Sequence, residues 1–156
     1  MLNRKDFLAT LPRRRLAAGA IIRDHDDRVC LVEPTYKDYW LLPGGTVEAD
    51  ESPRSGCRRE LVEELGLDRE LGPLLCMEWV SPDGGEDPHG ALMFCYDGGV
   101  IDPATINSIV TPDDELRGFR FVPVSELPNY TTARNIRRIE AALSALDGQV
   151  VELEPE

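Results

Sequence analysis

The segment from residue 45 to residue 67 constrains the fold of this chain more than any other part of the sequence. Ser52 followed by Pro53 is a typical helix start, with a capping hydroxyl and a proline at the first helical position. Gly66 is well placed to end the same helix, because glycine readily adopts the left-handed conformation of a C-cap. These signals predict a helix over residues 52–65.

This helix has two faces of different chemistry. Glu60, Glu63 and Glu64 stand at i, i+3 and i+4, so their side chains project within one arc of ~100°. The neighbouring arc carries an apolar stripe that predicts packing against a sheet: Cys57, Leu61 and Leu65. Clustered carboxylates are more often a solvated helix face, but three of them on a rigid support also suit a hard cation such as Mg²⁺, which binds carboxylate and phosphate oxygens.

The remaining chain alternates strand-like segments with turns. Strands are predicted over residues 16–22, 28–33, 74–80, 91–96 and 119–124. A second helix is predicted over residues 132–146, and the final residues 150–156 form either an edge strand or a free end. Gly44 and Gly45 predict a loop beside a site, and the polar segment 81–90 predicts a surface loop. The expected architecture is an α/β fold (α+β) in which a mixed sheet packs between helices.

Composition narrows the classes of protein. A chain of 156 residues, 42% hydrophobic and 29% charged, is expected to form a single domain over 1–156. No apolar run approaches the ~20 residues of a membrane span, and the N-terminus lacks the features of a secretory signal, so a cytoplasmic protein is expected. The net charge of −12 disfavours duplex nucleic acid as a partner. The four cysteines have no metal-ligand spacing and are expected to be buried thiols. The sequence does not set the oligomeric state, and a homodimer is one assembly that it allows.

Residues 45–67 match the pattern Gx5Ex7REUxEExGU, in which U is a bulky aliphatic residue, at all nine defining positions. The matched residues are Gly45, Glu51, Arg59, Glu60, Leu61, Glu63, Glu64, Gly66 and Leu67. By this signature the chain resembles the Nudix hydrolase family, and the resemblance extends upstream to Trp40, the Pro43 turn and Glu48. Asp50 is a departure, since many relatives carry glycine there, and it affects only the expected loop conformation.

The resemblance implies a Nudix-type α/β/α sandwich and a pyrophosphohydrolase that depends on Mg²⁺ or Mn²⁺. Its expected substrate is a small molecule, a nucleoside diphosphate linked to another group, such as a nucleoside triphosphate or an ADP-ribose-like compound. Glu60, Glu63 and Glu64 fall on the metal-binding positions of the family, together with the carbonyl of Gly45. Glu51 falls on the position that holds the signature arginine, here Arg59, by an ion pair.

Two residues compete for the role of general base. Glu60 is one candidate, because some relatives use a signature glutamate. Glu115, with Asp113 and Asp114 beside it, is the other, because acidic residues of a later loop serve in other relatives. A solvated turn is an equally good interpretation of the later cluster.

Residues outside the signature say less about the substrate. Arg15 and Lys37 are candidates for phosphate contacts, as are Arg13 and Arg14, and Trp40 is a candidate for stacking on a base. Further aromatic candidates are Tyr36, Trp79 and Phe94. Pro82 lies fifteen residues beyond Leu67, a spacing seen in ADP-ribose pyrophosphatases, although a proline in a surface turn is commonplace.

A catalytically silent ligand sensor of the same fold is the alternative function, and an isomerase of a related fold is a weaker one. Sensors commonly lose signature glutamates, whereas this chain retains all of them. The sequence therefore favours the hydrolase.

Overall fold

The computed structural model describes residues 1–112 and 114–155, and its centre is a mixed seven-stranded sheet. The strands are β1 (Arg15–Arg23), β2 (Val29–Pro34), β3 (Gly44–Thr46), β4 (Leu74–Val80), β5 (Ala91–Val100), β6 (Leu116–Val122) and β7 (Val151–Leu153). Their order is β6-β2-β1-β5-β4-β7, with β3 paired to β1. The β1/β5 and β4/β7 pairs are parallel and the other pairs are antiparallel. The predicted mixed sheet is confirmed.

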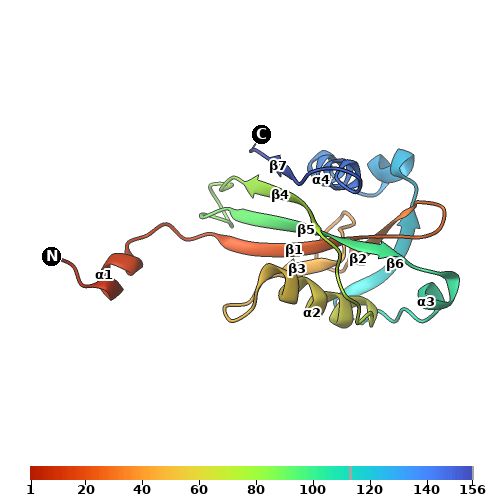
Figure 1. The fold of residues 1–156 in the computed structure, drawn as a ribbon, viewed down its shortest axis with the longest axis horizontal. Helices are drawn as coiled ribbons and strands as arrows, with labels where there is room; N and C mark the ends of the chain where they lie inside the picture. Colours follow the sequence, from red (N-terminus) through yellow and green to blue (C-terminus); the bar gives the residue numbers. More distant parts are fainter. Residues whose placement is uncertain (113, 156) are drawn as a thin grey trace.

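Two helices cover opposite faces of this sheet, α2 (Pro53–Leu65) on one side and α4 (Ala133–Ser144) on the other (Figure 1). Alternation along the central strands supplies a core for each face. Cys30 and Val32 of β2 pack in the core under α2, whereas Val29 and Leu31 pack in the core under α4. The sheet is therefore the middle layer of an α/β/α sandwich.

The helix α2 begins and ends where its sequence signals place it. The Ser52 side chain accepts a hydrogen bond from the Ser55 N–H, Pro53 is the first helical residue, and Gly66 is left-handed with a φ of 67°. Its apolar stripe is fully buried: Cys57, Leu61 and Leu65. The predicted helix and its packing on the sheet are confirmed.

Several short elements were not expected from the sequence. They are α1 (Arg4–Ala9), α3 (Pro103–Asn107) and the 3-10 helix η1 (Val124–Asn129). The predicted loop at Gly44 and Gly45 is wrong in part, because these residues form β3 and pair with β1. Glycine favours turns, so only the tertiary pairing reveals a strand there. The final segment contributes β7 as an edge strand, and segment 81–90 is a surface loop as predicted.

The chain before β1 extends away from the sandwich, with α1 at its tip (Figure 1). None of the helices within the described residues combines the length and apolar character that a membrane crossing requires.

Candidate active site

The three glutamates of α2 differ in exposure because the helix turns them progressively away from the sheet. Glu64 borders the apolar stripe and is 7% exposed. The side chain of Glu60 is 16% exposed and that of Glu63 is 53% exposed. The acidic arc therefore runs from the protein interior to the solvent.

Strand β3 forms the other half of this site. The N–H of Gly44 donates to a carboxylate oxygen of Glu64 at 2.7 Å. A Cβ added at Gly45 would lie 2.5 Å from a carboxylate oxygen of Glu60, so glycine is the residue that leaves room for that carboxylate. Two acidic side chains thus meet the backbone of two adjacent glycines.

Arg59 joins the loop before α2 to the helix itself. Its guanidinium donates to both carboxylate oxygens of Glu51, at 2.7 and 3.2 Å, which confirms the predicted contact between these two residues. The same group donates to the carbonyl of Thr46 at 3.0 Å, and to Glu60 and Glu63 at 2.9 Å each. Arg59 therefore offsets part of the negative charge of the acidic arc, through Glu60 and Glu63.

The ionisation of these carboxylates reflects their surroundings. Burial raises the pKa of Glu64 to about 8, and neighbouring carboxylates add to the shift while the Gly44 N–H opposes it. Burial also raises the pKa of Glu60, against the hydrogen bond from Arg59. The Arg59 hydrogen bond instead holds the pKa of Glu51 below its ordinary value. Glu60 and Glu64 are thus two carboxylates that a cation would stabilise in the charged form.

The later acidic loop reaches the same region. Thr35, which follows β2, donates its N–H to the carbonyl of Glu115 at 2.9 Å and its hydroxyl to the carbonyl of Asp114 at 3.2 Å. The Glu115 carboxylate is close enough to contribute to the raised pKa of Glu60 and of Glu64. The structure therefore brings Glu115 near the signature glutamates, while Asp113 lies outside the described residues.

An open cleft of about 1150 Å³ lies next to these carboxylates. Gly44 and Gly45, the residues that meet Glu64 and Glu60, form part of its wall. Within residues 1–112 and 114–155, six Lys and Arg residues line the cleft, against three Asp and Glu residues. These basic residues are Arg13, Arg14, Arg15, Lys37, Arg134 and Arg138. The cleft therefore concentrates positive charge in a protein whose net charge is −12.

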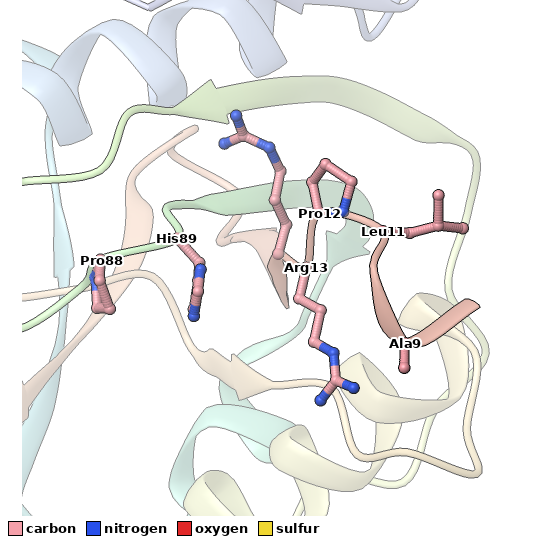
Figure 2. A pocket seen from close by; sticks show the side chains of 7 residues that line it. Ala9, Leu11, Pro12, Arg13, Pro88 and His89 are labelled. Carbon is pink, nitrogen blue, oxygen red and sulfur yellow. The ribbon is translucent and has the colours of Figure 1, made fainter. Parts of the chain in front are cut away.

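A smaller hollow of about 410 Å³ shares Arg13, Arg14 and His89 with the wall of the cleft. Figure 2 shows that it lies between the arm from Ala9 to Arg13 and the loop residues Pro88 and His89. Arg15 ties this loop to β1 through an ion pair with Asp87 at 3.0 Å.

The aromatic candidates occupy different places. Tyr36 lines the cleft, and its pKa is raised by burial and by the neighbouring carboxylate of Glu64. Trp40 instead packs edge-on against Tyr130 at 5.6 Å in the core under α4, and it is absent from the part of the cleft wall that the structure describes. Phe94 packs in the core under α2, and Trp79 is covered by the Arg14 guanidinium at 5.5 Å. The sequence did not predict that α4 contributes to the cleft, because this segment shows helical periodicity but no binding motif. Its cleft residues are Arg134, Asn135 and Arg138.

Comparison with known proteins settles the family. The model of the NUDIX domain matches residues 13–143. The chain belongs to the Nudix family. Diphosphoinositol polyphosphate phosphohydrolase 2 of Rattus norvegicus is 39% identical over 64 residues, which cover 40% of this chain and 36% of that protein. The RNA pyrophosphohydrolase of a Nitratiruptor species is 31% identical over 102 residues, 61% of this chain and 65% of that protein.

These matches span about a third to two thirds of the relatives' own length. Among solved structures, the NUDIX domain of Shewanella oneidensis NrtR, complexed with ADP ribose, superposes with a TM-score of 0.68 at 19% identity. That superposition covers 93% of this chain and 99% of the other and supports the Nudix fold.

The Nudix family typically depends on divalent metal ions, and the residues present suit such an ion. The donors gathered at β3 and α2 are carboxylate oxygens next to two glycines whose lack of a side chain leaves space for them. Over residues 1–112 and 114–155, no three carboxylate, thiol or imidazole groups converge closely enough to surround a cation in this side-chain arrangement. Arg59 holds Glu60 and Glu63, so these side chains would have to change partners before they could bind a cation.

Proposed function

We propose that this chain is a divalent-metal-dependent pyrophosphohydrolase that cleaves the diphosphate linkage of a nucleoside diphosphate joined to another group. One observation carries the proposal: two carboxylates pack against adjacent glycines beside a basic cleft. Glu64 accepts a hydrogen bond from Gly44, and Glu60 packs against Gly45. The cleft can hold an anionic substrate whose diphosphate reaches the acidic site.

The residues divide the work between holding the metal and holding the substrate. Glu60, Glu63 and Glu64, with the carbonyl of Gly45, would hold Mg²⁺ or Mn²⁺. A bound cation supplies positive charge that stabilises the negative charge developing on the diphosphate.

The ion pair between Glu51 and Arg59 fixes the loop between β3, which carries Gly45, and α2. Glu60 or Glu115 accepts the proton of the attacking water. Arg15 and Lys37, on the cleft wall, contact the phosphates outside the reacting bond.

A substrate panel tests this function. Nucleoside triphosphates, ADP-ribose, dinucleoside polyphosphates, nucleotide sugars and an inositol pyrophosphate are incubated with Mg²⁺ and, separately, with Mn²⁺, and the products are identified. The proposal expects metal-dependent release of a nucleoside monophosphate from at least one nucleotide compound. Binding of nucleotides without any turnover would favour the ligand sensor, and turnover of the inositol pyrophosphate alone would contradict the nucleotide substrate.

A further inference from the structure

A buried polar network forms the cleft wall at the N-terminal end of α4. Glu78 of β4 is 3% exposed and accepts a hydrogen bond from Nε of Arg138 at 2.5 Å. Nη1 of Arg138 donates to Oδ1 of Asn135 at 3.1 Å, and Asn135 is 8% exposed. Nδ2 of Asn135 donates to the hydroxyl of Thr131 at 2.8 Å, which donates to the carbonyl of Trp40 at 2.7 Å. Arg138 and Asn135 are thus held in fixed positions.

Both held residues line the cleft, and each has donor capacity left. Nη2 of Arg138 makes no hydrogen bond to any residue within 1–112 and 114–155. Asn135 uses one N–H of its amide for Thr131, which leaves the second one for a ligand. The wall therefore presents two adjacent hydrogen-bond donors on rigid supports.

Arg138 differs from Arg15 in how deeply its ion-pair partner is buried. Its ion-pair partner Glu78 is almost fully buried, so the pair as a whole is neutral and a phosphate would meet a carboxylate directly behind the guanidinium. Arg15 also has a carboxylate partner, but the Arg15 side chain is 47% exposed and Asp87 is 27% exposed on a surface loop, so solvent screens that pair. The wall at Arg138 is therefore suited to a neutral hydrogen-bond acceptor. The phosphates of a substrate would instead contact the other arginines of the cleft.

An apolar floor lies beside this wall. Met93 of β5 is the cross-strand partner of Glu78, and such partners project from the same face of a sheet. A Cβ added at Gly19 would lie 3.1 Å from Cε of Met93 and 3.6 Å from Cβ of Leu42, so these two side chains close over that glycine. Met93 and Leu42 both line the cleft and offer a surface for a flat ring.

We propose that Arg138 and Asn135 form a base-recognition subsite that selects a guanine nucleotide over an adenine nucleotide. Two adjacent donors match O6 and N7 of guanine, which are both acceptors, whereas adenine presents an amino donor next to N7. Glu78 and Thr131 act as positioning residues, because they hold the two donors without reaching the ligand. The proposal rests on the proposed function only for the identity of the cleft as the substrate site.

Calorimetry with the reaction products tests the subsite without turnover. The wild type should bind GMP on the order of tenfold to a hundredfold more tightly than AMP, the discrimination typical of a paired donor contact to a base. Arg138→Lys keeps the charge beside Glu78 but loses the planar fork, and it should bring the two affinities to within about threefold. The double variant Glu78→Gln/Arg138→Gln, which buries no unpaired charge, should do the same. Circular dichroism of both variants checks that the domain remains folded.

Arg137→Lys is the matched control. Arg137 is the neighbouring residue on α4, donates to the carbonyl of Glu154, and lies outside the cleft wall as far as the structure describes it. This variant should keep the wild-type preference for GMP. A wild type that binds the two products equally, or that binds neither, overturns the proposal, as does a folded Arg138→Lys protein that retains full preference.

Kinetics with GTP and ATP, or another nucleotide pair with one leaving group, extend the same comparison. Arg138→Lys should raise KM for the guanine compound about tenfold with little change in kcat, because the reacting diphosphate is bound elsewhere. Absence of any turnover by the wild type would count against the proposed function, while the GMP and AMP affinities would still decide the subsite.

Discussion

Gly44 and Gly45 are neighbours that require glycine for different reasons. Gly44 has a φ of 143°, and a Cβ there would lie 2.2 Å from the carbonyl oxygen of Ala18 in β1. At Gly45 the Cβ would instead meet the tip of the Glu60 side chain, which can move. The first glycine serves the backbone pairing of β3, and the second serves the acidic site.

This difference predicts separable effects of two alanine substitutions. Gly45→Ala should leave the domain folded but displace Glu60 and weaken Mg²⁺ affinity by on the order of tenfold to a hundredfold. Gly44→Ala should lower the free energy of unfolding, because β1 and β3 cannot both keep their positions. Calorimetric titration with Mg²⁺ and urea unfolding measure the two effects, and a Gly45→Ala protein with wild-type metal affinity would contradict the role given to that glycine.

The identity of the general base also depends on single residues. If Glu115 accepts the proton, Glu115→Gln should lower kcat by about 10² to 10⁴ while leaving Mg²⁺ affinity within a fewfold of wild type. Glu140, exposed on α4 at the opposite face of the sheet, supplies the control variant Glu140→Gln. Single-turnover rates and metal titrations on both proteins make the test. An unchanged kcat in Glu115→Gln would indicate that Glu60 is the general base.

At the scale of elements, α2 is held to the sheet by its apolar stripe. Leu61 is fully buried in the core under this helix, whereas its neighbour Val62 is 43% exposed. Leu61→Ala should reduce the free energy of unfolding by about 2–5 kcal/mol, since it removes buried surface and leaves a cavity. Val62→Ala should change it by less than ~0.5 kcal/mol. Equal losses in urea unfolding would mean that the helix is anchored elsewhere.

The turn between β1 and β2 is held by a buried carboxylate. Burial opposes ionisation of Asp24, but hydrogen bonds from Arg28 and from the Asp26 N–H outweigh it and hold the pKa of Asp24 below 3.8. The lowered pKa means that the folded state favours the charged form, so this stability is present above about pH 4 and is lost as the pH falls through the folded pKa.

Asp24→Asn should therefore cost about 1–3 kcal/mol of unfolding free energy at pH 7 and less at pH 3, which lies below the ordinary pKa of the group. Urea unfolding at the two pH values measures the difference. Asp26→Asn, at a side chain that is 77% exposed in the same turn, should have little effect at either pH. A constant cost of Asp24→Asn from pH 7 to pH 3 would contradict the ionic contribution.

The elements differ in how well the sequence predicts them. Helix α2 was predictable because its cap, its proline, its terminal glycine and its periodicity all agree. Strand β3 was not, because its glycines favour a turn and only pairing with β1 makes them a strand. The short helices α1 and α3 each span a turn or so, too little for a periodic pattern to appear.

For the whole molecule, the acidic signature was predictable but the substrate cleft was not. The signature is continuous in sequence, so Glu60, Glu63 and Glu64 could be placed on one face from their spacing alone. The cleft instead combines residues far apart in the chain, including Arg15 and Asn135, that the sheet brings together. The position of Trp40 shows that the sequence does not reveal which aromatic residues face the cleft, since this side chain packs with Tyr130 in the core.

The distribution of charge in the whole molecule sets the central requirement of the proposed function. Glu64 is buried near other carboxylates, and a bound divalent cation would stabilise the ionised form of all of them at once. Replacing Glu64 with glutamine removes one charge and keeps the size of the side chain. The domain should stay folded, because Gln retains an oxygen that can accept the Gly44 N–H.

Hydrolysis by Glu64→Gln at limiting Mg²⁺, measured beside wild type with the best substrate of the panel, is the most direct test of the proposed function. The variant should show a Mg²⁺ affinity weakened at least tenfold and a rate lowered by on the order of a hundredfold or more, with unfolding as cooperative as in wild type. Full activity of the folded Glu64→Gln protein at limiting Mg²⁺ would contradict the metal site and the function built on it.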